Sequence, residues 1–348
     1  MHARYDRVLD KRLIPFILPG GAFHFLVREY PVDDPFALDV QLRERNKIMY
    51  YHGTTRVLTV QLRIGVHGVE AKAHAAEAYG EYPGSRQPYV TLMRWWGVGD
   101  AHAFRAAFLA YLPSAVEATD AGFYRNQQEG YWQNRLCVRY GRRWTRADEL
   151  LIIDRECVVG FNHGKERDAF YRGIAGVYQG VKSRLQNDDK QQWGQPDDTG
   201  FGDELDMLAI NRSGDLVALE LKHGSNSSGI YWGPLQVAVY QDAFFKTLGS
   251  IRGQIRGLVA QKIELGLLPP DAGRLLEASP LTRVEPMLAV AEPNDSSQAW
   301  NMMKSVLAAM SRAGTPRPSL PLRLARIRDV SGEPGVEISQ PAIRGLHN

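Results

Sequence analysis

Two carboxylates and one lysine are spaced in this sequence so that they can meet at the end of a buried strand. Glu220 and Lys222 are two residues apart in an apolar run over residues 216–222, and Asp206 lies in the preceding run, residues 205–210. Side chains alternate across a strand, so Glu220 and Lys222 project from the same face. Charges at the end of such a strand must be paired or bound to a metal ion, because an isolated charge in a low-dielectric interior is costly.

Residues 211–215, between the two runs, are rich in turn-forming types and predict an antiparallel hairpin. The hairpin brings Asp206 across from Glu220, where the two carboxylates can share a hard cation, and Mg²⁺ is the expected ion. The backbone carbonyl of Leu221 is a candidate third ligand. A bound metal ion lowers the pKa of a coordinated water, and Lys222 can orient that water or help deprotonate it. These residue types indicate metal-dependent hydrolysis of a phosphodiester.

A helix is predicted over about residues 235–248, with Pro234 close to its start, as is common for helix entry. Gln236 and Tyr240 are four residues apart and therefore share one face of this helix. From there the two side chains can reach back to the metal site or to a phosphate. We count both among the catalytic candidates.

The Asp206, Glu220–Lys222 and Gln-x-x-x-Tyr motifs together resemble the PD-(D/E)XK nuclease superfamily, in its RecB-like branch. The resemblance implies a restriction-endonuclease-like α/β fold, with an αβββαβ core whose mixed sheet is flanked by helices. It also implies dependence on Mg²⁺ or Mn²⁺ and cleavage that leaves a 5′-phosphate. Leu205 stands where the proline of the family name would be, a departure that is common in the family. The resemblance covers residues 160–330 and nothing in the first 130 residues.

An acidic residue on the first core helix is common in this family, and Glu166 is the candidate for that position. Residues 165–185 have helical periodicity, and Glu166 lies at their start. The resemblance makes it a further candidate metal ligand. The alternative is a purely local role, because a glutamate in a first helical turn is favoured by the helix dipole alone.

The expected activity is that of a Mg²⁺-dependent deoxyribonuclease, with endonuclease action. DNA is preferred to RNA as the substrate because the resembled family mostly cuts DNA. One alternative is an inactive nuclease-fold module that binds nucleic acid or assembles a complex. Another is an unrelated protein in which a strand, a turn and a strand mimic the motif. A homo-oligomer and a partner subunit both remain open.

A basic segment with an aromatic centre is the candidate for nucleic-acid contacts outside this motif. Arg142, Arg143 and Arg146 surround Trp144, and Arg139 precedes them. Basic residues interleaved with an aromatic one suit phosphate contacts together with base stacking. The alternative is a hairpin turn that carries solvated charges.

Other constellations point to no second chemistry. His67, Glu70 and His74 lie in a predicted helix over 66–79, but their spacing is not that of a zinc protease, so they are expected to be solvated. The sequence contains neither a phosphate-binding glycine loop nor a dinucleotide-binding fingerprint. ATP-driven unwinding is therefore not expected.

Composition fits a soluble protein of two domains. The chain has 348 residues, 44% of them hydrophobic and 23% charged, with a formal net charge of +3 that permits binding of a polyanion without arguing for it. Cys137 and Cys157 cannot form a disulfide framework, so a reducing, cytoplasmic setting is expected. We expect neither a signal peptide nor a membrane-spanning segment.

Three segments are predicted along the chain. Residues 1–130 form an α+β domain for substrate or partner recognition, residues 131–335 form the nuclease domain, and residues 336–348 form a loose tail. Residues 186–202 are expected to be a loop that could lie over the active site. The remaining expected elements are strands at 56–62, 89–96, 135–140, 150–153, 157–160, 286–291 and 320–327, and helices at 101–112, 251–267 and 298–313.

Overall fold

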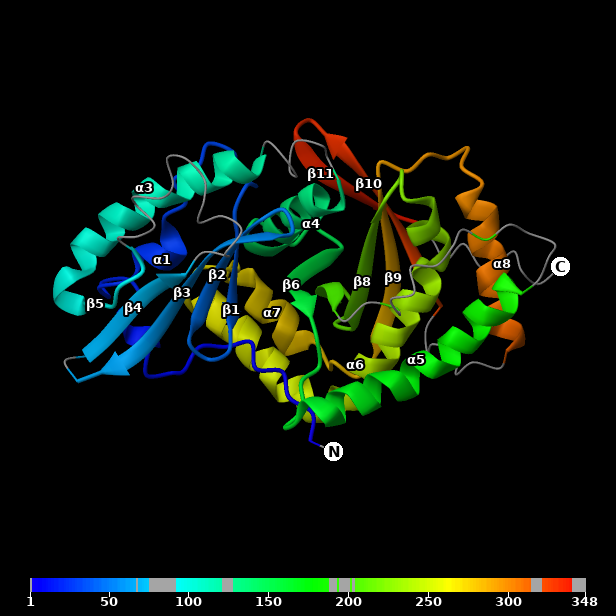
Figure 1. The fold of residues 1–348 in the computed structure, drawn as a ribbon, viewed down its shortest axis with the longest axis horizontal. Coiled ribbons are helices and arrows are strands. Elements are labelled where there is room, and N and C mark those ends of the chain that lie inside the picture. The colour runs from blue at the N-terminus through cyan, green and yellow to red at the C-terminus, as the bar shows by residue number, and fades with distance from the viewer. Residues whose placement is uncertain are drawn as a thin grey trace. The chain divides into compact units, whose positions relative to one another are not determined.

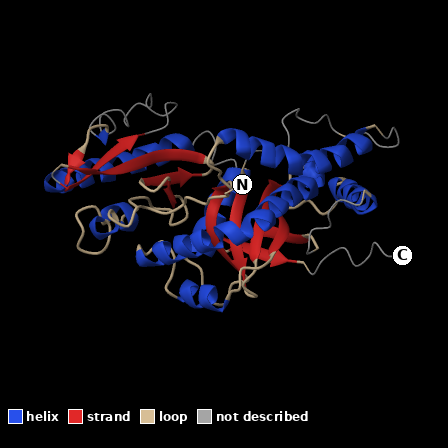
Figure 2. Cartoon of the chain, turned by 90° about the horizontal axis from the view of Figure 1, so that it is seen from below, coloured by secondary structure: helices blue, strands red, loops and turns tan. Residues whose placement is uncertain are grey.

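The computed structural model shows an α/β protein made of two compact units (Figures 1 and 2). It describes residues 2–66, 68–74, 92–120, 128–187, 193, 201, 204–313 and 321–339. The first unit, here called the six-stranded unit after its sheet, comprises Met1–Tyr5, Glu149–Gly253 and Glu277–Asn348. The second, the five-stranded unit, comprises Asp6–Asp148 and Gln254–Leu276.

The sheet of the six-stranded unit has the order β11-β10-β9-β8-β7-β6. β6, β7 and β8 form an antiparallel meander, β8, β9 and β10 run parallel, and β11 returns antiparallel to β10. The central strands β8 and β9 are buried along almost their whole length, as expected for strands covered on both sides. The strands are β6 (Leu150–Cys157), β7 (Leu205–Asn211), β8 (Leu216–His223), β9 (Val284–Ala291), β10 (Arg323–Val330) and β11 (Glu333–Ile338).

Three helices pack an apolar layer against this sheet. They are α5 (Gly164–Gln186), α6 (Ser227–Glu264) and α8 (Ala299–Arg312). Their buried side chains share one core with Leu288 and Val290 of β9. α5 lies between β6 and β7 in the chain, so the observed order is strand, helix, two strands, helix, strand. The expected αβββαβ order placed this helix before all three strands of the meander.

The sheet of the five-stranded unit is antiparallel, in chain order from β1 to β5. Phe104 and Phe108 of α3 enter the same core as Tyr50 and Val60 of the sheet. The elements are η1 (Ile14–Phe16), α1 (Phe25–Arg28), β1 (Asp39–Arg43), β2 (Lys47–His52), β3 (Thr55–Gly65), β4 (Gly68–His74), β5 (Trp96–Gly97), η3 (Val98–Asp100), α3 (Ala101–Thr119), α4 (Glu129–Cys137) and the π-helical turn η5 (Val138–Arg142). The last residues of α6 and most of α7 (Asp271–Ala278) also belong here.

The boundary between the units differs from the expected one at residues 130 and 131. Residues 131–148 belong to the five-stranded unit because α4 is anchored there. Asn134 of α4 is fully buried, and its side-chain amide donates to the backbone carbonyls of Phe36 and Ala37, at 2.6 and 2.9 Å. The strand expected at 135–140 was therefore wrong, since these residues continue α4 into η5.

The helix expected over residues 66–79 was also wrong where the structure describes it. Residues 68–74 form β4, in which Val69, Ala71 and Ala73 are buried and the residues between them are half-exposed. The alanine content suggested a helix, but the period of two and the turn at Gly68, with φ of +116°, decided for a strand. Residues 75–91 lie outside the description, and β5 covers only the end of the strand expected at 89–96.

Most of the other expected elements are confirmed. The helices expected at 101–112, 165–185 and 298–313 correspond to α3, α5 and α8, while those at 235–248 and 251–267 lie almost wholly within the single helix α6. The strand at 150–153 is confirmed as part of β6, whereas the strand expected at 157–160 was wrong beyond Cys157, because Gly160 forms only an isolated bridge with Arg4. Residues 336–338 pair with β10 as part of β11, which corrects the loose tail expected from 336. Most of the loop expected at 186–202 lies outside the described residues.

In the part of the chain that the structure describes, no helix is both long enough and apolar enough to cross a membrane.

Candidate active site

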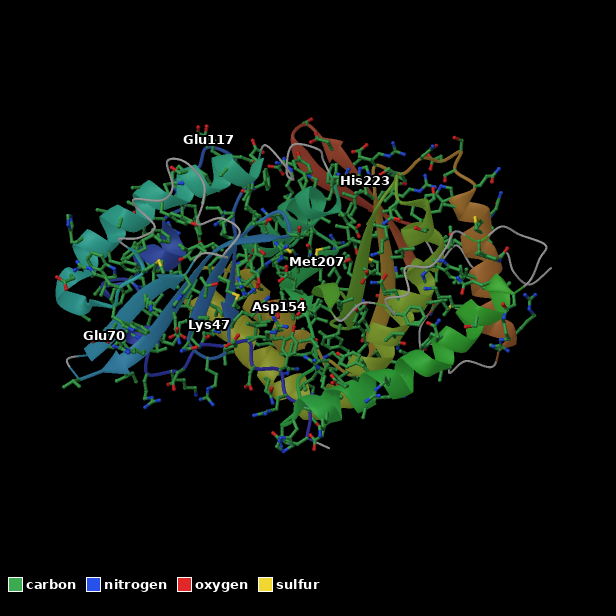
Figure 3. All side chains as sticks on the ribbon, in the orientation of Figure 1. Lys47, Glu70, Glu117, Asp154, Met207 and His223 are labelled. Atoms are coloured by element: carbon green, nitrogen blue, oxygen red, sulfur yellow. The ribbon has the colours of Figure 1, made fainter. Side chains whose placement is uncertain are left out.

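Strands β7 and β8 stop pairing at the point where the two predicted carboxylates lie. Their ladder runs from Ile210 opposite Leu216 to Met207 opposite Leu219, and Met207 is labelled in Figure 3. Just beyond the end of the ladder, the side chains of Asp206 and Glu220 are hydrogen-bonded to each other. The predicted hairpin and the predicted juxtaposition of the two acids are both confirmed.

The carboxylate of Asp206 takes the place of a strand carbonyl at this point. Its Oδ2 accepts a hydrogen bond from the backbone N–H of Leu221 at 2.7 Å. A carboxylate that replaces the missing ladder bond satisfies a strand N–H and is held in one orientation. Asp206 is therefore positioned by the backbone of the neighbouring strand.

Glu220 and Lys222 share one face of β8, as the alternation predicts. The ammonium Nζ of Lys222 donates to Oε1 of Glu220 at 2.7 Å, and Glu220 is only 1% exposed. In the parallel register with β9, Glu220 lies beside Leu288 and Lys222 beside Val290. Those two β9 residues belong to the apolar layer under α5, α6 and α8, so the charged group occupies the margin of that layer.

Burial governs the electrostatics of the acid pair. Desolvation raises the pKa of Asp206 above its ordinary value, and it outweighs the opposing effects of the Lys222 charge and of the hydrogen bond from Leu221. Glu220 and the charge of Arg155 oppose the rise more weakly. Keeping both acids ionised is therefore costly for the protein alone, and a divalent cation between them would offset that cost.

The carboxylate oxygens of Asp206 and Glu220 are of the type that Mg²⁺ or Mn²⁺ takes when few protein groups hold it. No three His, Cys, Asp or Glu side chains converge in a metal-binding arrangement among the residues that the structure describes. Mg²⁺ is usually bound by one or two carboxylates and keeps several waters, so Asp206 and Glu220 meet its ordinary requirement. The Leu221 carbonyl remains a candidate ligand.

Glu166 is not brought into a three-carboxylate group with Asp206 and Glu220. It lies in the first turn of α5, where the local role weighed against the ligand role is an acid at a helix start. Its Oε2 is enclosed and makes no hydrogen bond in the structure.

Tyr240 and Gln236 come from α6, which begins at Ser227, so Pro234 lies inside the helix rather than at its start. Tyr240 is fully buried, and its hydroxyl donates to the backbone carbonyl of Phe201 at 3.3 Å. Burial raises the pKa of Tyr240, and the negative charges of Glu220 and Asp206 raise it further. The phenol therefore stays protonated, as a hydrogen-bond donor within electrostatic reach of both acids, while a hydrogen bond with Gln236 acts in the opposite direction.

Two residues near the acids were not among the sequence candidates. Arg155 of β6 is fully buried and pairs in register with Met207, the neighbour of Asp206. Tyr171 of α5 accepts the backbone N–H of Val159 at 3.0 Å and contributes to the electrostatic surroundings of Tyr240. A signal for Arg155 was present, because the charged residues 154–156 end an apolar strand in the same way as Glu220 and Lys222 end theirs.

The predicted nucleic-acid contact of Trp144 is wrong, because its indole is only 6% exposed and cannot stack on a base. The three arginines around it are engaged within the five-stranded unit. The Arg142 guanidinium lies 4.1 Å from the centre of the Tyr30 ring, that of Arg143 lies 4.8 Å from the Phe36 ring, and Arg146 forms an ion pair with Asp271 at 2.6 Å.

The histidine-rich group at 67–74 forms no zinc site in the described residues. Glu70 pairs instead with Arg63, at 2.6 Å, and His67 lies outside the description. The prediction that Glu70 and His74 occupy a helix is corrected by their place in β4.

Comparisons with family models, with curated protein sequences and with solved structures find no match to the chain.

Proposed function

We propose that this protein is a metal-dependent nuclease that hydrolyses phosphodiester bonds, in DNA in preference to RNA. The observation that carries the proposal is the meeting of Asp206 and Glu220 where β7 and β8 separate, with Lys222 hydrogen-bonded to Glu220. Two acids and one ammonium are grouped there at the margin of an apolar layer. Such a group is expensive to bury, and cation binding accounts for its cost.

The protein groups divide the chemistry between them. Asp206 and Glu220 would hold Mg²⁺ or Mn²⁺, which supplies a polarised phosphate and a water of lowered pKa. Lys222 carries a positive charge next to the acids, where it can orient the attacking water and offset charge that develops on the phosphate. Tyr240 keeps its proton and can donate a hydrogen bond near the acids. The N–H of Leu221 fixes Asp206 throughout.

The test is cleavage by the full chain of single-stranded, double-stranded and branched DNA and RNA with Mg²⁺ or Mn²⁺. Asp206→Asn and Lys222→Met are expected to lower the rate at least about 100-fold, since each removes a group that acts on the reacting centre. Asp100→Asn and Lys304→Met make the same chemical changes at exposed positions and should cut at the wild-type rate.

Two results would reject the proposal. One is cleavage that persists in both site variants or proceeds fully in excess EDTA. The other is binding of nucleic acid without cleavage under any of these conditions, which would favour the alternative of an inactive nuclease-fold module.

A further inference from the structure

The five-stranded sheet has a basic face on the side opposite its core. Val60 and Ala73 are cross-strand partners, and both enter the core under α3. Their neighbours Lys47, Gln61 and Lys72 are in register across β2, β3 and β4, and because side chains alternate they project from the opposite face. Adjacent strands lie about 4.8 Å apart, so the two lysines are anchored about 10 Å from each other.

Positive charge exceeds negative charge on this face. Lys47 is paired with Glu44 and Arg63 with Glu70, whereas no carboxylate lies within ion-pair distance of Lys72 among the described residues. Lys47 and Glu70 are labelled in Figure 3. Arg56 is also exposed, and its guanidinium lies 4.0 Å from the sulfur of Met49.

The imidazole of His74 lies within electrostatic reach of both lysines. Burial lowers the pKa of His74, and the charges of Lys72 and Lys47 lower it further. Both lysines therefore act on the same small area of the sheet. A polyanion placed there would meet two ammonium groups that already repel other cations.

The turn that joins β3 to β4 adds an apolar tip, Val66, at the end of this face. Val66 is 94% exposed, so its side chain is not covered by the protein. On the basic face beside the tip, the Arg63 guanidinium lies 3.8 Å from the centre of the Trp95 ring.

We propose that this basic face and the hairpin tip together bind nucleic acid that has unpaired bases. The Lys47–Lys72 row would contact successive phosphates, and Val66 would contact bases that are not stacked. Sheet faces bind single strands with basic and aromatic side chains, and apolar wedges insert where bases are unstacked. A lipid surface fits less well, because the apolar groups are confined to the tip while the charges lie across the sheet.

This surface extends the proposed function and can be tested apart from it. The full chain is titrated, in EDTA to prevent cleavage, against a fluorescent single-stranded DNA, a three-way junction and a blunt duplex. Lys47→Ala/Lys72→Ala is compared with Lys11→Ala/Lys304→Ala, which removes the same charge from exposed positions elsewhere. Val66→Ser is compared with Val330→Ser, because Val330 is also exposed, at 60%.

The sheet-face double variant should bind single-stranded DNA about tenfold more weakly, and its slope of log affinity against log salt should fall by about 1.4, which is two phosphate contacts on a single strand. Val66→Ser should weaken binding to the single strand and the junction by about threefold without changing the duplex. Both control variants should match the wild type.

The proposal is overturned if the sheet-face variant and its control bind equally, or if the wild type binds no nucleic acid. It is also overturned if the sheet-face variant binds DNA as the wild type does but binds vesicles of phosphatidylcholine and phosphatidylserine more weakly than the wild type. Cleavage by the wild type with unchanged binding in this variant would leave the nuclease proposal standing and reject only this surface. If the sheet-face variant loses binding but the wild type never cleaves nucleic acid, the binding surface stands and the nuclease proposal is rejected.

Discussion

The two ends of strand β8 both bury acidic groups, but they satisfy them differently. At the start, Asp215 forms two hydrogen bonds with the guanidinium of Arg283, at 2.7 and 3.0 Å. Glu285, on the adjacent strand, pairs with Arg323 at 3.0 Å and accepts the side-chain amide of Asn211 at 2.7 Å. Each acid there has an arginine of its own.

At the other end of β8 the two acids face each other. Lys222 is paired with Glu220, and Asp206 accepts the backbone N–H of Leu221. Closed ion pairs hold strands together and leave no capacity for another charge. A pair of facing acids beside one ammonium gives little to the fold, and it gains from a cation. We infer that the first end of β8 has a structural role, and the proposed function places the chemistry at the second end.

The largest expected effect comes from making the same change at both ends. Glu220→Gln should lower metal-dependent cleavage at least about 1000-fold, because it removes one of the two carboxylates proposed to hold the cation. Glu285→Gln should leave the rate of folded protein unchanged. Cleavage assays at equal concentrations of folded protein measure both. Equal losses in the two variants would erase the distinction between the ends.

The effects on stability should have the reverse order, with Glu285→Gln more destabilising than Glu220→Gln. Glu285→Gln should lower the free energy of unfolding by about 2 kcal/mol, since Arg323 loses its partner and an amide nitrogen meets a buried donor. Glu220→Gln should cost less, because the loss of the Lys222 ion pair is partly offset by the removal of one of two neighbouring acids. Urea unfolding of both variants in EDTA gives the two values. A larger loss for Glu220→Gln would mean that this end is structural after all.

Two buried tyrosines sharpen the contrast. Tyr240→Phe should lower the cleavage rate about tenfold, because its hydroxyl lies near the acids, and should cost less stability than Tyr178→Phe, because the bond to Phe201 is long at 3.3 Å and the bond with Gln236 is the other one lost. Tyr178→Phe is the matched change, as its hydroxyl donates to Asp242 at 2.7 Å within the same unit. It should destabilise the protein by about 1 kcal/mol and keep the rate. Cleavage rates and urea unfolding midpoints of both variants separate the effect on catalysis from the effect on stability. An unchanged cleavage rate for Tyr240→Phe would show that Tyr240 does not belong to the site.

The smallest expected effect is a pH dependence. Because the folded protein raises the pKa of Asp206, its ionisation destabilises the metal-free fold progressively as pH rises above the ordinary value of 3.8, and the effect levels off above the raised pKa. Asp206→Asn lacks this penalty. In EDTA it should therefore be more stable than the wild type at neutral pH, with the gain vanishing in acid. A gain that is independent of pH would contradict the assigned cause.

Local pattern was sufficient for the centre of the site. A period of two put Glu220 and Lys222 on one face, and the turn residues at 211–215 put Asp206 opposite Glu220. Both inferences need only neighbours in sequence. The same holds for α5 and β9, whose periodicity is strong.

Long-range packing decided what the sequence did not show. Arg155 reaches the site only because β6 pairs with β7 across the 23-residue helix α5. Trp144 looked available for stacking, yet the fold buries it. The basic face around Lys47 and Lys72 was invisible because it exists only when β2, β3 and β4 align in register. Alanine in β4 also favoured a helix until its neighbours fixed a strand.

The most direct test of the proposed difference between the two ends of β8 is to count the metal ions that the protein binds. Mn²⁺ binding can be followed by electron paramagnetic resonance in the wild type, Glu220→Gln and Glu285→Gln. We expect Mn²⁺ to bind the wild type and Glu285→Gln alike, and the ion to be lost from Glu220→Gln. Binding that survives in Glu220→Gln, or that is absent from the wild type, would contradict the assignment of a cation site to the Asp206 and Glu220 end of β8.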